Sequence, residues 1–165
     1  MSTLAQAPLN ESLGEDLHAA VEKTFSSMFG TKVTSTFKVI PREQTPSGDG
    51  TAIVQVAQVE PQGALMITFP QATLFGLLKK FYKRDFTELD KTAIDAVGEI
   101  TNIIFGGFKA KARAKNFQFR ISMPSLSSGG APRIASVIWT LHGEFQSDLG
   151  PFHVVLMQVG SKLVG

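Results

Sequence analysis

Residues 93–107 read AIDAVGEITNIIFGG, and apolar residues recur in this stretch every three or four positions. That spacing predicts an amphipathic helix. Placed at about 100° per residue, one side of the helix collects a stripe that should face a hydrophobic core. The members of this predicted core stripe are Ala93, Val97, Ile100, Ile104 and Phe108.

The opposite side of the same helix collects Asp95, Glu99, Asn102 and Gly106. Residues three and four apart share one helix face, so we expect these four to form an exposed ridge. A carboxylate and a carboxamide on a rigid ridge are suited to holding a partner and placing a water. Spacing alone does not establish such a role, because polar residues normally occupy the outer face of an amphipathic helix.

Two glycines follow the polar residues, and each costs about 1 kcal/mol relative to alanine inside a helix. We therefore expect another group to approach closely there. Gly106 would leave the helix backbone uncovered among the ridge residues. Gly107, nearer the core side, would let another element of the fold pack tightly.

Outward from this stretch, the helix is predicted to span about residues 88–115, with Thr87 as its cap. A first helix is predicted over 12–29, where Ser12 and Glu15 resemble a capping box and Gly30 is a natural stop. Another helical pattern begins at Pro70 and ends near Arg84.

Runs of β-branched and alternating residues predict the strands, and turn-rich stretches predict the loops. The strands are 31–40, 51–59, 63–69, 117–123, 136–142 and 152–159, and the main loops are 41–50, 124–133 and 143–151. One helix, three strands, two helices and three strands indicate an α+β fold with a mainly antiparallel sheet, on which the long helix packs.

A chain of 165 residues, 43% hydrophobic and 18% charged, is expected to fold as one globular domain. We place that domain at 12–165, after a flexible N-terminus at 1–11. A net charge of +2 does not require a nucleic-acid partner. Cysteine is absent, which excludes disulfides, thiolate metal sites and cysteine nucleophiles and fits a reducing cytoplasm.

No apolar run approaches the roughly 18 residues of a membrane span, so no membrane partner is expected. The N-terminal MSTLAQAPLNES lacks the basic start and apolar centre of a signal peptide. Together these features predict a cytoplasmic location.

Two other groups of residues have the composition of possible sites. The basic KAKARAK, residues 109–115, scatters its charges around a helix, so a solvated helix end is favoured over a nucleic-acid patch. His18, His142 and His153 are isolated along the chain and are expected to have structural roles, which leaves no predicted metal site.

The stretch ELDKTAIDAVGEITNIIFGGFKAKA, residues 88–112, resembles the signature helix of the CheC/CheX/FliY family of response-regulator phosphatases. The family pattern is Asp or Ser, three residues, Glu, two residues and Asn, followed by Gly and Lys. Asp95, Glu99, Asn102, Gly106 and Lys109 occupy those places. FQFRISMPSLSSGG, residues 117–130, is similar to the strand and loop that follow in CheX proteins.

CheC-type members usually carry two such motif helices, and this chain has one, so the resemblance is greatest to CheX. A departure from the pattern is the bulky Phe105, where small residues are common. This bulky residue is expected to narrow the docking surface. CheX proteins resemble dimers paired through edge strands, which implies a homodimer.

The resemblance implies a phosphatase acting on the phospho-aspartate of a CheY-like receiver domain in chemotaxis. Glu99 and Asn102 are then the catalytic residues, with Asn102 orienting the water and Glu99 docking the receiver. Asp95, Gly106 and Lys109 are expected to contact the partner. The receiver would bring its own Mg²⁺, and no cofactor of this chain is expected. The alternative is a non-catalytic adaptor of the same fold that binds a receiver or a flagellar switch protein.

Overall fold

The computed structural model describes residues 12–41, 49–57, 62–115, 120–121, 125–127 and 137–159. The predicted flexible N-terminus, most of the predicted loop 41–50 and much of the predicted strand 117–123 lie outside them. Three helices and seven strands occur among the described residues. They are α1 (Leu13–Phe29), β1 (Val33–Val39), β2 (Gly50–Ala57), β3 (Gln62–Phe69), α2 (Gln71–Tyr82), α3 (Lys91–Arg113), β4 (Arg120–Ile121), β5 (Ser125–Ser127), β6 (Val137–Ser147) and β7 (Gly150–Val159).

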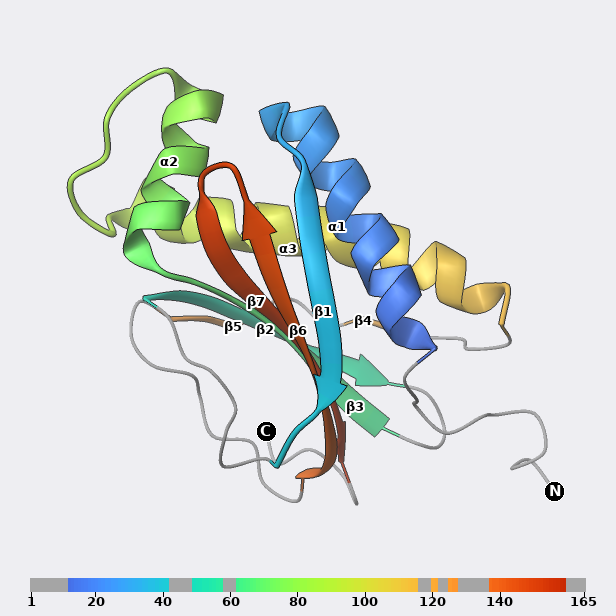
Figure 1. Ribbon diagram of the computed structural model, residues 1–165. Coiled ribbons are helices and arrows are strands. Elements are labelled where there is room, and N and C mark those ends of the chain that lie inside the picture. The colour runs from blue at the N-terminus through green and yellow to red at the C-terminus, as the bar shows by residue number, and fades with distance from the viewer. Residues whose placement is uncertain are drawn as a thin grey trace, which may run out of the picture.

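The strands form a single sheet in the order β1-β6-β7-β3-β2-β4, and β5 also pairs with β2. Every pair described is antiparallel. The three helices lie on one face of this sheet (Figure 1). The predicted α+β fold with an antiparallel sheet is therefore confirmed.

The core lies between the helices and the sheet, and phenylalanine rings join its elements. Phe152 of β7 stacks on Phe25 of α1, with ring centroids 4.7 Å apart, on Phe145 of β6 at 5.0 Å and on Phe69 of β3 at 5.3 Å. All four rings are fully buried. This aromatic cluster holds α1 on the sheet, and α1 in turn supports α3.

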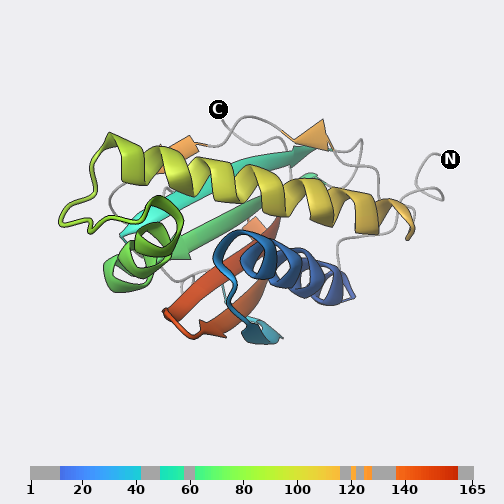
Figure 2. The same cartoon turned by 90° about the horizontal axis from the view of Figure 1, so that it is seen from above.

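Helix α3 crosses the sheet with β5 on one side and α1 and α2 on the other (Figure 2). Its contacts agree with this placement, since it packs against β2 and β5 as well as against both other helices. One flank of α3 therefore faces a strand and the other faces helices.

The prediction of a loop at 143–151 is wrong for most of these residues. Strand β6 continues to Ser147, and only Asp148 and Leu149 form the turn to β7. Gly143, the first residue of that predicted loop, is a strand residue paired with Phe37 of β1. A β-carbon on Gly143 would lie 2.4 Å from the Phe37 ring, so this glycine makes room for an aromatic side chain.

Strand β5, which pairs with β2, lies inside the predicted loop 124–133. The sequence did not predict this strand, because three residues are too few to show an alternating pattern. The predicted caps also differ. Ser12 precedes α1, but its side chain makes no cap hydrogen bond, and Asp90 rather than Thr87 caps α3.

Candidate functional site

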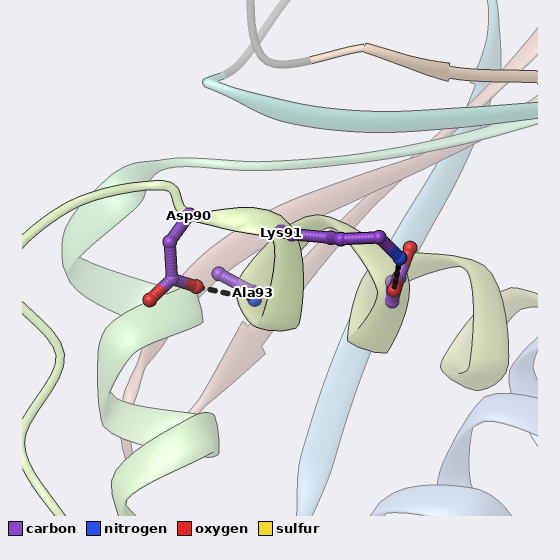
Figure 3. Close-up of polar contacts among 4 residues, drawn as sticks. Asp90, Lys91 and Ala93 are labelled. Carbon is purple, nitrogen blue, oxygen red and sulfur yellow. Dashed lines mark hydrogen bonds and ion pairs between the residues drawn. The ribbon is translucent and has the colours of Figure 1, made fainter.

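Helix α3 begins at a defined N-cap. The Asp90 carboxylate accepts a hydrogen bond from the Ala93 amide, with 2.9 Å between Oδ1 and N (Figure 3). Such a cap satisfies one of the unpaired amides of the first turn. The helix therefore starts three residues later than the prediction of about 88, and it ends at Arg113, close to the predicted 115.

The two faces of α3 separate as the sequence predicts. All five members of the core stripe are buried, with Ala93, Val97 and Ile104 fully so and Ile100 and Phe108 at 1% exposure. On the other face, the ridge of Asp95, Glu99, Asn102 and Gly106 is exposed, and Lys109 is half-buried. The chain thus presents its polar residues on one side of a helix whose other side is anchored in the core.

Within the ridge, Asp95 already has a partner. Lys91, one turn earlier, donates a hydrogen bond to it, with 2.7 Å between Nζ and Oδ2. Figure 3 shows the Lys91 side chain extending along the helix from the capped end. The hydrogen bond and the negative charge of Asp95 both raise the pKa of Lys91. Sequence reasoning missed Lys91, although its spacing of four from an acidic residue was the available signal.

Glu99 and Asn102 differ from Asp95, because neither side chain forms a hydrogen bond or ion pair with another described residue. They lie three positions apart on a helix, so they project from adjacent turns of the same face. Hydrogen-bonding groups of an acid and an amide therefore remain available to a partner.

The two consecutive glycines have different surroundings. A β-carbon on Gly106 would meet no atom within 4 Å, so the fold itself does not require a glycine there. A β-carbon on Gly107 would lie 3.4 Å from the β-carbon of Ala20 in α1. Gly107 therefore faces α1, on the core side as predicted, but 3.4 Å is an ordinary van der Waals distance and the packing there would also accommodate alanine. Gly106 leaves open space beside Asn102.

The expectation attached to Phe105 does not hold. Its side chain is 1% exposed and belongs to the core cluster. Because the ridge faces the other way, this bulky residue does not narrow the exposed surface.

The histidines are less isolated than the sequence indicates. His142 of β6 and His153 of β7 lie 2.8 Å apart, from Nε2 to Nδ1, because neighbouring strands bring them together. Burial lowers the pKa of both. His18 Nδ1 lies 2.6 Å from Ser35 Oγ, and its Nε2 lies 3.6 Å from Glu22.

At the other end of α3, Lys115 lies 3.2 Å from Asp16 of α1, so one charge of the KAKARAK segment serves an internal contact. The described residues contain no group of three or more acidic or histidine side chains that could hold a metal ion. In the described part of the chain, no helix combines the length and apolar character that crossing a membrane requires.

Comparison with known proteins gives a consistent result. Residues 51–138, more than half of the chain, match the family model described as chemotaxis phosphatase CheX. This matched region contains all of α3. Among the curated proteins, none matches the chain.

Several solved structures have the same fold. A CheC-like superfamily protein from Shewanella sp. PV-4 aligns with a TM-score of 0.82 at 18% identity, covering 92% of this chain and 100% of that one. Chemotaxis protein CheX from Vibrio vulnificus aligns with a TM-score of 0.79 at 21% identity, covering 89% and 99%. The CheX–CheY–BeF3–Mg²⁺ complex from Borrelia burgdorferi provides a third match, with a TM-score of 0.68 at 20% identity, covering 89% and 97%.

The family match and the shared fold agree with the motif on α3. The chain belongs to the CheX family of chemotaxis phosphatases.

Proposed function

We propose that this protein hydrolyses the phospho-aspartate of a CheY-like receiver domain and that the ridge on α3 is its working surface. The observation that carries the proposal is the exposure of Glu99 and Asn102, which lack described partners, on a helix whose opposite face is buried. Family membership and the CheX–CheY complex from Borrelia burgdorferi support a receiver as the partner.

Asn102 is assigned the chemical step. Phosphoryl transfer requires an attacking water in line with the bond that breaks, together with stabilisation of the phosphoryl charge. A carboxamide can accept a hydrogen bond from that water without competing as a nucleophile. As the water oxygen bonds to phosphorus, the bond to the aspartyl oxygen breaks, which releases phosphate and a free carboxylate.

Glu99 is assigned to docking. A carboxylate one turn away from Asn102 can pair with a receiver lysine and hold the two proteins in register. Removal of the Glu99 carboxylate should weaken docking as well as turnover, because a small displacement of the attacking water would lose much of the rate acceleration.

The remaining ridge residues have supporting roles in this proposal. Gly106 gives the receiver close access to the helix backbone, and Lys109 offers a positive charge to an acidic receiver surface. Asp95 is a secondary contact, because its carboxylate is already bonded to Lys91. The receiver supplies the Mg²⁺ that neutralises phosphoryl charge, and this chain contributes no cofactor.

We further propose that the protein is cytoplasmic and has no nucleic-acid or membrane partner.

We also propose a homodimer. Strand β1 ends the sheet order and pairs only with β6 among the described strands, which leaves one edge open to a second copy. Light scattering during gel filtration measures the mass directly. A species of one chain at micromolar concentration would refute the dimer and leave the phosphatase proposal standing.

The competing proposal is an adaptor that binds a receiver without hydrolysing it. Receiver labelled with phosphate, in the presence of Mg²⁺, separates the two. Faster phosphate loss on adding this protein supports the enzyme, whereas binding with an unchanged rate supports the adaptor.

A further inference from the structure

Two large apolar side chains are exposed on opposite flanks of the ridge. Ile103 of α3 is 45% exposed and Leu126 of β5 is 38% exposed. Neither was singled out from the sequence, since Ile103 fits an ordinary helix and Leu126 lies in a segment predicted to be a loop.

The position of Leu126 follows from its contact with α3. A β-carbon on Gly98 would lie 3.2 Å from a methyl carbon of Leu126, so the leucine lies directly over this glycine. Gly98 is one turn before Asn102, and positions four apart share a helix face. Leu126 therefore borders the ridge on the side of Asn102, where β5 runs beside α3 (Figure 2).

Ile103 borders the other side. It lies one turn before Gly107, which packs against Ala20 of α1, and one turn after Glu99. Its side chain is therefore on the flank of α3 that faces α1, next to Glu99. Glu99 and Asn102 thus lie between two exposed apolar groups that come from different elements.

We propose that Ile103 and Leu126 are apolar shoulders that contact the receiver on either side of the ridge and set the affinity of docking. This inference rests on the proposed function and adds to it the residues that bind without reacting. The two shoulders are continuous with the Glu99/Asn102 surface, so a receiver that docks on Glu99 and Asn102 would also contact the shoulders. On the receiver, Ile103 and Leu126 would contact apolar side chains around the phosphorylation site.

Two physical effects follow from such shoulders. Apolar surface buried on docking contributes affinity without touching the reacting atoms. Contacts that surround a polar centre also exclude water from it, which strengthens the hydrogen bonds and ion pairs made there. Substitution of a shoulder residue should therefore change KM, whereas substitution of Asn102 should change kcat.

The test is the KM and kcat of receiver dephosphorylation for Ile103→Ser. Phe81→Ser is the matched control, because Phe81 is also a large exposed apolar side chain, at 48%, but lies on α2 rather than on α3 or β5. We expect Ile103→Ser to raise KM by about tenfold with kcat changed by less than about twofold, and Phe81→Ser to leave both unchanged.

Leu126→Ser provides the second arm, with its thermal melting followed to check that β5 still packs on α3. It should raise KM in the same way as Ile103→Ser. A wild-type KM for Ile103→Ser, with Asn102→Ala still inactive, overturns the shoulders while the phosphatase survives. A fully active Asn102→Ala overturns the assigned chemistry instead, so the two failures are distinguishable.

Discussion

Lys91 and Asp95 form a hydrogen-bonded ion pair one turn before Glu99, with 2.7 Å between Nζ and Oδ2. The pair leaves Glu99 as the carboxylate of the ridge that has no partner among the described residues. This difference separates two acidic residues that helix spacing alone places together on the ridge.

The pair predicts unequal effects of removing the two carboxylates. Asp95→Ala should lower kcat/KM for receiver dephosphorylation by less than about threefold, because an exposed pair on the helix surface contributes little. Glu99→Ala should lower it much more, since the partner proposed for Glu99 is the receiver. Steady-state rates over a range of receiver concentrations compare the two variants. A larger loss for Asp95→Ala would contradict the assignment of Glu99 to docking.

Gly106 and Gly107 offer a matched pair of substitutions. Gly106→Ala meets open space, so helix propensity alone should raise the free energy of unfolding by about 0.5–1 kcal/mol. The added methyl group should nevertheless weaken receiver docking. Denaturant unfolding and dephosphorylation rates measure the two effects. Gly107→Ala faces α1 and should leave activity unchanged, so equal losses at both positions would count against close approach at Gly106.

Gly143→Ala should destabilise the fold by about 1–3 kcal/mol, because its β-carbon would clash with the Phe37 ring. Urea unfolding of the variant measures this loss. Gly106→Ala, which adds the same group in open space, is the control. An unchanged unfolding midpoint for Gly143→Ala would mean that the glycine serves no packing role.

This glycine also illustrates where sequence reasoning fails. Gly143 looks like a turn residue until the strand pairing places Phe37 opposite it. His142 and His153 likewise become neighbours only through the pairing of β6 with β7. Both facts depend on the register between paired strands, which no local pattern encodes.

The sequence predicted α3 much better, because its period is a local property. The buried stripe from Ala93 to Phe108 and the exposed ridge from Asp95 to Gly106 both follow from helix geometry. Leu126 could not be found in the same way. Its position beside the ridge, opposite Ile103, depends on β5 packing over Gly98, a tertiary contact.

The histidine pair predicts a pH dependence of stability. Burial disfavours the charged imidazole and lowers the pKa of both His142 and His153 below the ordinary value of 6.5. The nearby His153 and Lys38 charges also lower the pKa of His142, while Glu144 opposes the shift in both. Because the unfolded chain binds protons first, stability is retained above about pH 6.5 and lost as pH falls below it.

The measurement is the free energy of unfolding at about pH 7.5 and pH 5, for wild type and for His153→Asn. The loss at the lower pH should be smaller in the variant, which lacks one of the two buried imidazoles. An identical loss in both proteins would assign the pH dependence to other groups.

The role proposed for Asn102 is measured by the single-turnover rate at which saturating protein dephosphorylates a Mg²⁺-loaded phospho-receiver. Asn102→Ala should reduce the accelerated rate by roughly 100-fold while its melting temperature stays near that of wild type. Lys111→Ala, an exposed change on the same helix away from the ridge, should match wild type. An Asn102→Ala protein that dephosphorylates the receiver at the wild-type rate would mean that Asn102 does not place the attacking water.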